Sequence, residues 1–273
     1  RLFARAYRDG NSRERRHIDN RIEEEYTVHY SKQFQTYNCA NYCTINFFKK
    51  TEEIPMSTTQ AVQTQTPSYA EVVQGRRSVR HYDPSFTISR DELKDLFAEA
   101  LKAPSSSNLQ PWRFLVIDSP ELKQKLLPIA NNQQQVVDAS AVIAVLGDVE
   151  SYKLGETIYN RAYEAGYMPE ATRDMFIANS TKIYGNLPPE IARKIVYTDG
   201  GLVSMQIMLS AKARGYDTVP MGGYNAQKFV EEFKIGERYV PIMLIAIGKA
   251  AQEGHPSVRL TVDEVVRWNE FDF

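Results

Sequence analysis

Two uninterrupted apolar runs, each six residues long, constrain the fold of this chain more than any other feature. They are Ala141–Leu146 and Ile242–Ile247. A membrane-spanning helix needs roughly 20 apolar residues, so runs this short predict buried β-strands in a soluble protein. We therefore expect a sheet at the centre of the fold and no membrane partner.

Helices are expected around these strands. Ser68 and Ser89 are each followed three residues later by a glutamate, which is the capping-box pattern of a helix N-terminus. Further helices are expected from residue 119 and at 150–165, 169–184, 188–215 and 225–234, and strands at 112–118, 140–147, 218–219 and 239–248. Many helices with few strands predict an α+β domain in which helices pack in layers against a sheet.

One of the expected helices lacks a polar face. From Gly201 to Ala213, apolar residues lie nearly all round the helix. A helix of this kind is normally buried on all sides, so we expect this one to be surrounded by protein.

Charge and cysteine content exclude several functions. The net charge is −1 and the pI is near 6.5, so the chain lacks the positive excess of many proteins that bind nucleic acid or anionic membranes. Its two cysteines, Cys39 and Cys43, have no histidines at zinc-site spacing. We expect neither a disulfide framework nor a metal site, and a cytoplasmic location.

The first 66 residues differ in character from the rest. Residues 1–55 mix arginine-rich, acidic and polar aromatic stretches without a sustained helix or strand period. Met56 is the first methionine, and the segment 56–66 is rich in Ser, Thr and Gln. We expect 1–55 to be a non-native or disordered leader, 56–66 a flexible polar leader, and 67–273 a single domain. A targeting extension is the alternative for 1–55, although transit peptides are poor in acidic residues.

A basic turn, Gly75-Arg-Arg-Ser-Val-Arg80, follows the first expected helix. Guanidinium forks and a hydroxyl suit a phosphate or the polar edge of a flavin ring. A solvated basic turn is the alternative, and it is the better interpretation of this segment taken alone.

A polar turn, Ala103-Pro-Ser-Ser-Ser-Asn-Leu-Gln-Pro-Trp112, lies between an expected helix and strand. Serine, asparagine and backbone N–H groups in such a turn can hold a planar polar ring. An ordinary connection would explain the serines, but it explains less well two amides crowded against a tryptophan.

Two further segments could contact a ligand. Val219-Pro-Met-Gly-Gly-Tyr-Asn225 has paired glycines after a strand, which allow close approach to a ligand, although a plain turn fits equally. Lys249 and Arg259, after the last strand, could neutralise a phosphate or simply face solvent. The sequence has no G-x-G-x-x-G, P-loop, G-x-S-x-G or H-E-x-x-H motif. If the chain uses NADH or NADPH, the nicotinamide would therefore visit a bound flavin rather than a dinucleotide-binding fold.

In this order and spacing the four segments resemble the FMN-dependent nitroreductase family, over about residues 69–268. The combination of Arg-Arg-Ser-x-Arg with a later Pro-Ser-Ser-x-Asn-x-Gln-Pro-Trp carries the resemblance. It implies an α+β, nitroreductase-like fold with a central, mostly antiparallel sheet flanked by helices. It also implies an intertwined homodimer with two FMN sites at the subunit interface, whose core would be the apolar helix at 201–213.

The resemblance also implies which residues hold the cofactor. Contacts to the FMN phosphate, ribityl chain and ring edge would come from Arg76, Arg77, Ser78 and Arg80. Contacts to the FMN bound mainly by the other subunit would come from Pro104, Ser105, Ser106 and Asn108. The reactive ring edge would lie near Gly222 and Gly223, the ring and ribityl chain near Asn132 and Gln135, and the phosphate near Arg259 and Lys249.

Two of these positions depart from well-known enteric members of the family. Those members carry a lysine in place of Gln135 and an acidic residue in place of Gly222, and this chain is closer to Gram-positive members. A cation near flavin N1 and O2 stabilises the reduced flavin anion, so Arg80 would take over that task. The departures concern flavin potential and acceptor range.

The implied function is transfer of hydride from NADH or NADPH, through flavin N5, to nitroaromatics, quinones or similar small acceptors in a ping-pong cycle. No catalytic acid or base is assigned, because solvent can supply the protons. A free-flavin reductase or a flavoenzyme for one specific metabolite would keep the same fold. A non-enzymatic flavin-binding regulator is the third alternative, since fold does not fix function.

Overall fold

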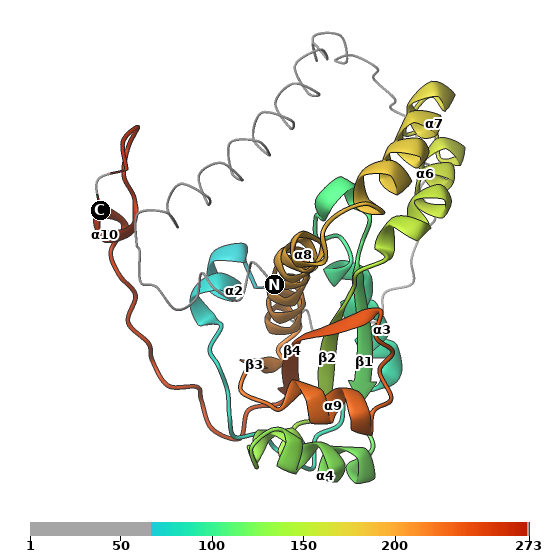
Figure 1. The fold of residues 1–273 in the computed structure, drawn as a ribbon. Helices are drawn as coiled ribbons and strands as arrows, with labels where there is room; N and C mark the ends of the chain where they lie inside the picture. The colour runs from blue at the N-terminus through green and yellow to red at the C-terminus, as the bar shows by residue number, and fades with distance from the viewer. Residues whose placement is uncertain (1–66, 272) are drawn as a thin grey trace, which may run out of the picture. The chain divides into compact units, whose positions relative to one another are not determined.

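Both six-residue apolar runs lie in the two central strands of a four-stranded antiparallel sheet (Figure 1). The computed structural model describes residues 67–271 and 273. The strands, in spatial order, are β1 (Trp112–Ile117), β2 (Ala141–Asp148), β4 (Tyr239–Gly248) and β3 (Asp217–Met221). Every residue of β2 is buried, and in β4 the residues 244–247 are buried whereas Ile242 and Met243 are half-buried. The prediction of buried strands is confirmed for β2 and for most of the run in β4.

The sheet is covered on both faces, which explains why its central strands read as continuous apolar runs. Along β2, Val142 and Ala144 belong to one core cluster, whereas Ile143 and Val145 belong to the other. Successive side chains of a strand point to opposite faces, so a strand with two covered faces needs apolar residues at every position.

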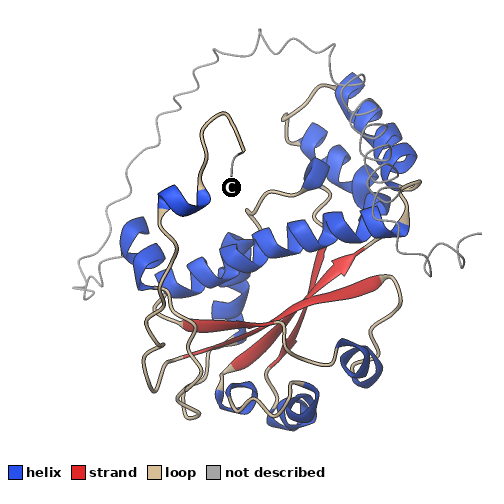
Figure 2. Cartoon of the chain, turned by 60° about the vertical axis from the view of Figure 1, so that its left-hand side comes forward, coloured by secondary structure: helices blue, strands red, loops and turns tan. Residues whose placement is uncertain are grey.

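Helices form the two covering layers (Figure 2). One face of the sheet packs against α3 (Arg90–Ala100) and the long α8 (Pro189–Ala213). The other face packs against α4 (Pro120–Ile129), α5 (Gln135–Asp138) and α9 (Ala226–Glu232). The predicted α+β class with a helix-flanked antiparallel sheet is confirmed.

The remaining elements lie at the ends and edges of these layers. In chain order they are α2 (Tyr69–Gly75), η1 (Ser106–Asn108), η2 (Ser151–Leu154), α6 (Gly155–Glu164), α7 (Glu170–Asn179), η3 (Ser180–Tyr184) and α10 (Val262–Val265). Both predicted capping boxes are present, at Ser68 and Ser89. The helix expected at 169–184 ends in a π-helical turn, η3, a form that the sequence pattern did not indicate.

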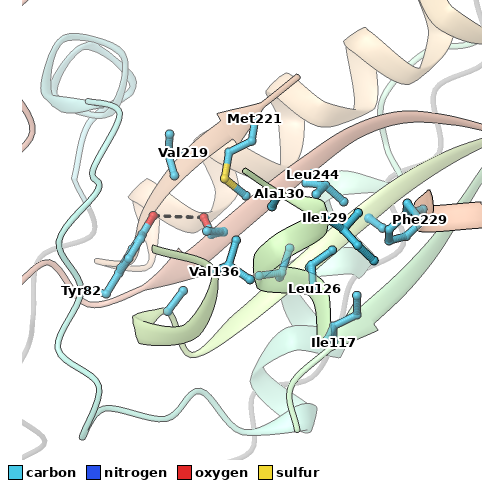
Figure 3. Packing of buried hydrophobic residues seen from close by; sticks show 14 of the residues in the cluster. Tyr82, Ile117, Leu126, Ile129, Ala130, Val136, Val219, Met221, Phe229 and Leu244 are labelled. Carbon is cyan, nitrogen blue, oxygen red and sulfur yellow. Dashed lines mark hydrogen bonds between the residues drawn. The ribbon is translucent and has the colours of Figure 1, made fainter. Parts of the chain in front are cut away.

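The chain after the basic turn is fixed to the sheet by a buried tyrosine. Figure 3 shows Tyr82 among the side chains of the core cluster that α4 and α9 cover. Its hydroxyl donates to the carbonyl of Ala246 in β4 at 3.1 Å. Burial strongly raises the pKa of this hydroxyl, so Tyr82 stays a neutral anchor that positions residues 76–80.

Two expectations concern the N-terminal residues of the chain and the burial of α8. The leader at 1–55 and the polar segment 56–66 lie outside the described residues, so their assignment stays a prediction. In helix 201–213, Leu202 is 44% exposed and Met205 39%, so the single chain does not bury this helix on all sides, and its expected burial in a dimer core stays a prediction. One face of α8 therefore has no covering element among residues 67–271.

No helix in the described residues is long and apolar enough to cross a membrane. Within the same residues, no group of three or more His, Cys, Asp or Glu side chains is arranged to hold a metal ion.

Candidate functional site

The basic turn lies beside β3, a strand at the edge of the sheet. Ser78 forms a parallel bridge with Thr218, and the N–H of Val79 donates to the Thr218 carbonyl at 3.1 Å. The Val79 side chain is buried, whereas Arg80 is exposed. Because side chains alternate along an extended chain, Ser78 and Arg80 project away from the core on the same side.

A cavity of about 480 Å³ opens where the basic turn meets the start of β3 and the end of β4. Arg77 and Lys249 both line it, and so does Lys212, which is paired with Asp217 at 3.0 Å. Glu253 at the wall offsets part of the positive charge. The structure thus brings together two of the predicted phosphate-binding cations, from residues 172 positions apart in sequence.

The three other predicted cations have no carboxylate partner among the described residues. Arg76, Arg80 and Arg259 form no ion pair with an acidic side chain of the described residues. The Arg259 guanidinium donates instead to the Ser257 hydroxyl and the Val258 carbonyl, each at 2.8 Å. It does not line the cavity, so this chain alone does not unite Arg259 with Lys249. Unpaired guanidinium groups are suited to bind a phosphate.

A cluster of side-chain amides lies at the other end of β3. Asn131 and Gln133 donate to the carbonyl of Gly223 at 2.9 and 3.0 Å. Gln135 is buried, and its amide donates to Gln133 Oε1 at 2.9 Å and to the sulfur of Met221 at 3.4 Å. These bonds join two segments that the sequence predicts as parts of one site.

The paired glycines leave open space above this end of the strand. Apart from the chain neighbours of each glycine, no atom of the described residues lies within 4 Å of the position that a Cβ would take on Gly222 or Gly223, and both residues are exposed. Neither needs a positive φ angle, so backbone conformation does not account for them. Neither packing nor conformation requires glycine at these two positions. The absence of a side chain would, however, allow a ligand to approach the backbone closely.

Strained backbone marks the amide cluster as well. Asn131 and Asn132 have φ angles of 56° and 54°, in the left-handed region that non-glycine residues seldom occupy. Asn132 is exposed, and its N–H donates to the Leu127 carbonyl at 2.9 Å. Residues held in such conformations concentrate at ligand sites.

Edge strand β3 therefore joins two chemically different ends. Its first residue, Asp217, lies at the cationic cavity, and its last, Met221, lies at the amide cluster. The first and last residues of a five-residue strand lie roughly 13 Å apart. This arrangement suits an elongated ligand with an anionic group at one end and a planar hydrogen-bonding ring at the other.

The polar turn contains the second concentration of strained backbone. Ser107, Asn108 and Gln110 have φ angles of 49°, 54° and 46°. The Gln110 N–H donates to the Ser105 hydroxyl at 3.0 Å, and its side-chain amide donates to Asn108. Pro104 and Asn108 are exposed, so the turn presents its polar groups outward.

Three helical segments anchor this turn. The Tyr159 hydroxyl of α6 donates to the Ser107 carbonyl at 2.7 Å, and the Ser107 hydroxyl lies 2.6 Å from that of Tyr184 in η3. The Asp199 carboxylate of α8 accepts from the N–H of Ser106 at 3.0 Å and from its hydroxyl at 3.1 Å. Burial raises the pKa of Asp199, and it raises the pKa of Tyr159 to about 12.

The polar turn is not brought together with the other predicted residues within one chain. It leads directly into β1, whereas the basic turn and the paired glycines adjoin β3. These two strands form opposite edges of the sheet. The predicted site residues thus form two groups that a single chain keeps apart.

Several residues of these groups were not anticipated from the sequence. Asn131 and Gln133 belong to the run Asn-Asn-Gln-Gln-Gln at 131–135, and that uninterrupted polarity beside a buried strand was an available signal. Asp199 stands directly before Gly200 and Gly201, at the start of the apolar part of α8. Tyr159 and Tyr184 carried no local signal, because their role depends on contacts distant in sequence.

Known proteins share this sequence pattern and fold. The model of the nitroreductase family matches residues 73–249. YdgI of Bacillus subtilis, named as an NAD(P)H nitroreductase, is 51% identical over 205 residues, which cover 74% of this chain and 98% of YdgI. The CLA biosynthesis enone reductase of Lactiplantibacillus plantarum is 39% identical over 187 residues, which cover 67% of this chain and 86% of that protein.

Solved structures agree. A nitroreductase from Exiguobacterium sibiricum, described in complex with FMN, superposes with a TM-score of 0.72 at 48% identity; the match covers 76% of this chain and all of that one. A protein from Staphylococcus epidermidis described as an NAD(P)H:FMN oxidoreductase gives a TM-score of 0.72 at 37% identity, and covers 78% of this chain and all of its own.

Proposed function

The chain belongs to the nitroreductase family, and on that basis we propose which residues hold its cofactor and which acceptors it reduces. It is an FMN-dependent oxidoreductase that uses NAD(P)H as reductant. When bound, FMN accepts hydride from the nicotinamide and passes it to the acceptor. A cytoplasmic location accords with this reductant.

The observation that carries the assignment is the chemistry along β3. Arg77 and Lys249 line the cavity at its start, and the amides of residues 131–135 surround its end. FMN has a dianionic phosphate at one end and a planar ring with hydrogen-bonding edges at the other. The cations at the start of β3 match the phosphate, and the amides at its end match the ring, so the two groups of residues are arranged as an extended FMN requires.

Each group of residues has a proposed task. The phosphate would be held by cations of the basic turn together with two cations that follow β4, with Ser78 reaching the ribityl chain. The phosphate cations are Arg76, Arg77, Lys249 and Arg259. The ring would lie over Gly222 and Gly223, with Asn132 and Gln135 at its polar edge. Arg80, exposed and unpaired, would supply the positive charge that neutral Gln135 does not.

A homodimer would complete the site. The polar turn lies at the opposite sheet edge from the rest of the predicted residues, so it reaches FMN only if the FMN is held by a second copy. Leu202 and Met205 leave an uncovered apolar face on α8. The segment after β4 adds more exposed apolar side chains, among them Val258 and Trp268. Association through these surfaces would bring Pro104, Ser105, Ser106 and Asn108 to the partner's flavin.

The proposed acceptors are small electron-poor conjugated molecules, such as nitroaromatics and quinones. The chain's part in the reaction is to orient cofactor and acceptor, and solvent supplies the protons. Conjugated enones form a second candidate class, favoured by the 39% identity to the enone reductase. Reduction of free flavin is a third, favoured by the likeness to the S. epidermidis protein.

A steady-state panel separates these acceptors. Protein loaded with FMN is supplied with NADH or NADPH and tested with nitrofurazone, menadione, a conjugated enone and free FMN. The proposal predicts the highest kcat/KM for nitrofurazone or menadione. A preference of more than about a hundredfold for the enone or for free FMN would instead assign the enzyme to that class.

A further inference from the structure

Asp199 is a buried carboxylate that faces the polar turn, and only 2% of it is exposed. Its two oxygens accept from the backbone N–H and the hydroxyl of the same residue, Ser106, at 3.0 and 3.1 Å. It forms no ion pair with a basic side chain of the described residues. A buried carboxylate without a cation costs stability, which singles out Asp199 among the residues of α8.

The hydrogen bond to Asp199 determines whether the Ser106 hydroxyl can donate or accept toward a ligand. A serine hydroxyl has one hydrogen to donate and two lone pairs that accept. Ser106 gives its hydrogen to Asp199 Oδ1, so the remaining capacity of its oxygen is to accept. Any ligand group that binds Ser106 Oγ must therefore carry an N–H or O–H.

We propose that Asp199 is a positioning residue that sets Ser106 as a hydrogen-bond acceptor for the flavin. The inference rests on the proposed function, in which Ser106 reaches FMN. The donors of FMN are the ring N3–H and the ribityl hydroxyls, whereas its phosphate carries acceptors only. Asp199 thus directs Ser106 to the ring or ribityl chain and away from the phosphate.

The remaining anchors of the turn make this role separable from loop folding. Tyr159 and Tyr184 hold Ser107 from α6 and η3, so the turn keeps two of its three tethers when Asp199 changes. Asp199→Asn preserves the shape and one acceptor oxygen, but it sets an N–H group against Ser106 Oγ. The hydroxyl of Ser106 then accepts from residue 199 and its hydrogen turns toward the ligand.

A double-mutant cycle on FMN affinity tests the inference. Asp199→Asn and Ser106→Ala should each raise the FMN Kd about tenfold, the effect of one hydrogen bond. Asp199→Asn should have no further effect once Ser106 is alanine, because its action passes through that hydroxyl. In the Ser106→Thr protein, which keeps a hydroxyl, the response to Asp199→Asn should persist.

Ser204→Ala is the matched control. Ser204 is a buried serine of the same helix, and it bonds to the Gly200 carbonyl rather than to the turn. Its removal should leave the FMN Kd unchanged. Additive effects in the cycle, or a wild-type Kd in Asp199→Asn, would overturn the inference while leaving the proposed function intact. A wild-type protein that fails to bind FMN would overturn both.

A measurement on the wild-type protein keeps the inference testable even if a variant does not fold. The Ser106 amide hydrogen, bonded to a buried carboxylate, should exchange with solvent at least tenfold more slowly than an unstructured amide. Exchange at the unstructured rate in the FMN-loaded protein would show that the bond to Asp199 is not maintained, and would overturn the inference.

Discussion

The side-chain amide of Gln135 donates a hydrogen bond to the sulfur of Met221 at 3.4 Å. This bond links the first residue of α5 to the last residue of β3. Gln135 is 5% exposed. A neutral amide therefore occupies a buried place beside the expected flavin ring, where enteric members of the family carry a lysine.

Gln135→Lys should make the flavin midpoint potential more positive. A cation near the ring stabilises the reduced, anionic flavin more than the oxidised form, and a stabilisation of about 1.4 kcal/mol corresponds to roughly 30 mV for a two-electron couple. Spectroelectrochemical titration measures the shift. Gln134→Lys, at the exposed neighbouring position, is the matched control. An equal shift in both variants, or a negative shift, would contradict the placement of Gln135 at the ring.

Replacing Arg76 and Arg80 together by alanine should release FMN from the purified protein. Each unpaired guanidinium that binds the cofactor contributes a charge-assisted hydrogen bond, worth about 1.5–3 kcal/mol, so the pair should raise the Kd by at least a hundredfold. Fluorescence titration with FMN measures the change.

Arg90→Ala provides the comparison for the arginine pair. Arg90 is also an arginine of the surface, but it is paired with Asp118 at 2.8 Å, outside the proposed site. Its removal should leave FMN occupancy as in the wild type. Unchanged occupancy in the double variant would mean that the basic turn only faces solvent.

Leu202→Glu should convert the proposed homodimer to monomers and lower FMN occupancy at the same time. A charge on the uncovered face of α8 would be buried without a partner on association, and the polar turn would lose its access to the second flavin. Light scattering coupled to gel filtration gives the mass. Leu122→Glu on α4, at a similarly exposed apolar position, should remain dimeric. If the Leu202→Glu variant stays dimeric with full FMN occupancy, α8 is not part of the interface.

The stability difference between wild type and Asp199→Asn should depend on pH. Burial raises the pKa of Asp199 above its usual value of 3.8, so the folded protein holds this proton at a pH where the unfolded chain has lost it. The free energy of unfolding of the wild type therefore falls as pH rises from about 4 through the folded pKa of Asp199. The asparagine variant has no carboxyl group at this position, so its free energy of unfolding does not fall for this reason. Urea unfolding of both proteins between pH 4 and 7 should show the wild-type advantage shrinking. A constant or growing advantage would contradict the raised pKa.

Sequence patterns predicted the elements whose cause is local. The apolar runs of β2 and β4 had to be strands with covered faces, and the caps at Ser68 and Ser89 needed only a glutamate three residues away. The basic turn and the paired glycines were also visible, because cations without nearby acids and glycines after a strand are local features.

What the sequence could not indicate depends on contacts between distant residues. Asp199 meets Ser106 across 93 positions, and Gln133 meets Gly223 across 90. Asn108 and Asn132, which adopt left-handed conformations, lie close in sequence to these contacts. For α8 the limit is different, because a helix that is apolar on every side fits burial within one chain and burial in an assembly equally well. Only the exposure of Leu202 and Met205 shows that the described residues of a single chain leave one face open.

Anaerobic titration of the purified protein with NADH and with NADPH tests the central claim most directly. The protein as isolated, or after incubation with FMN, should be yellow, and at least one nicotinamide should bleach the flavin absorbance with one equivalent per bound FMN. Addition of an oxidised acceptor should restore the colour. Protein that takes up no FMN, or whose bound flavin neither nicotinamide reduces, would contradict the assignment of an FMN-dependent NAD(P)H oxidoreductase.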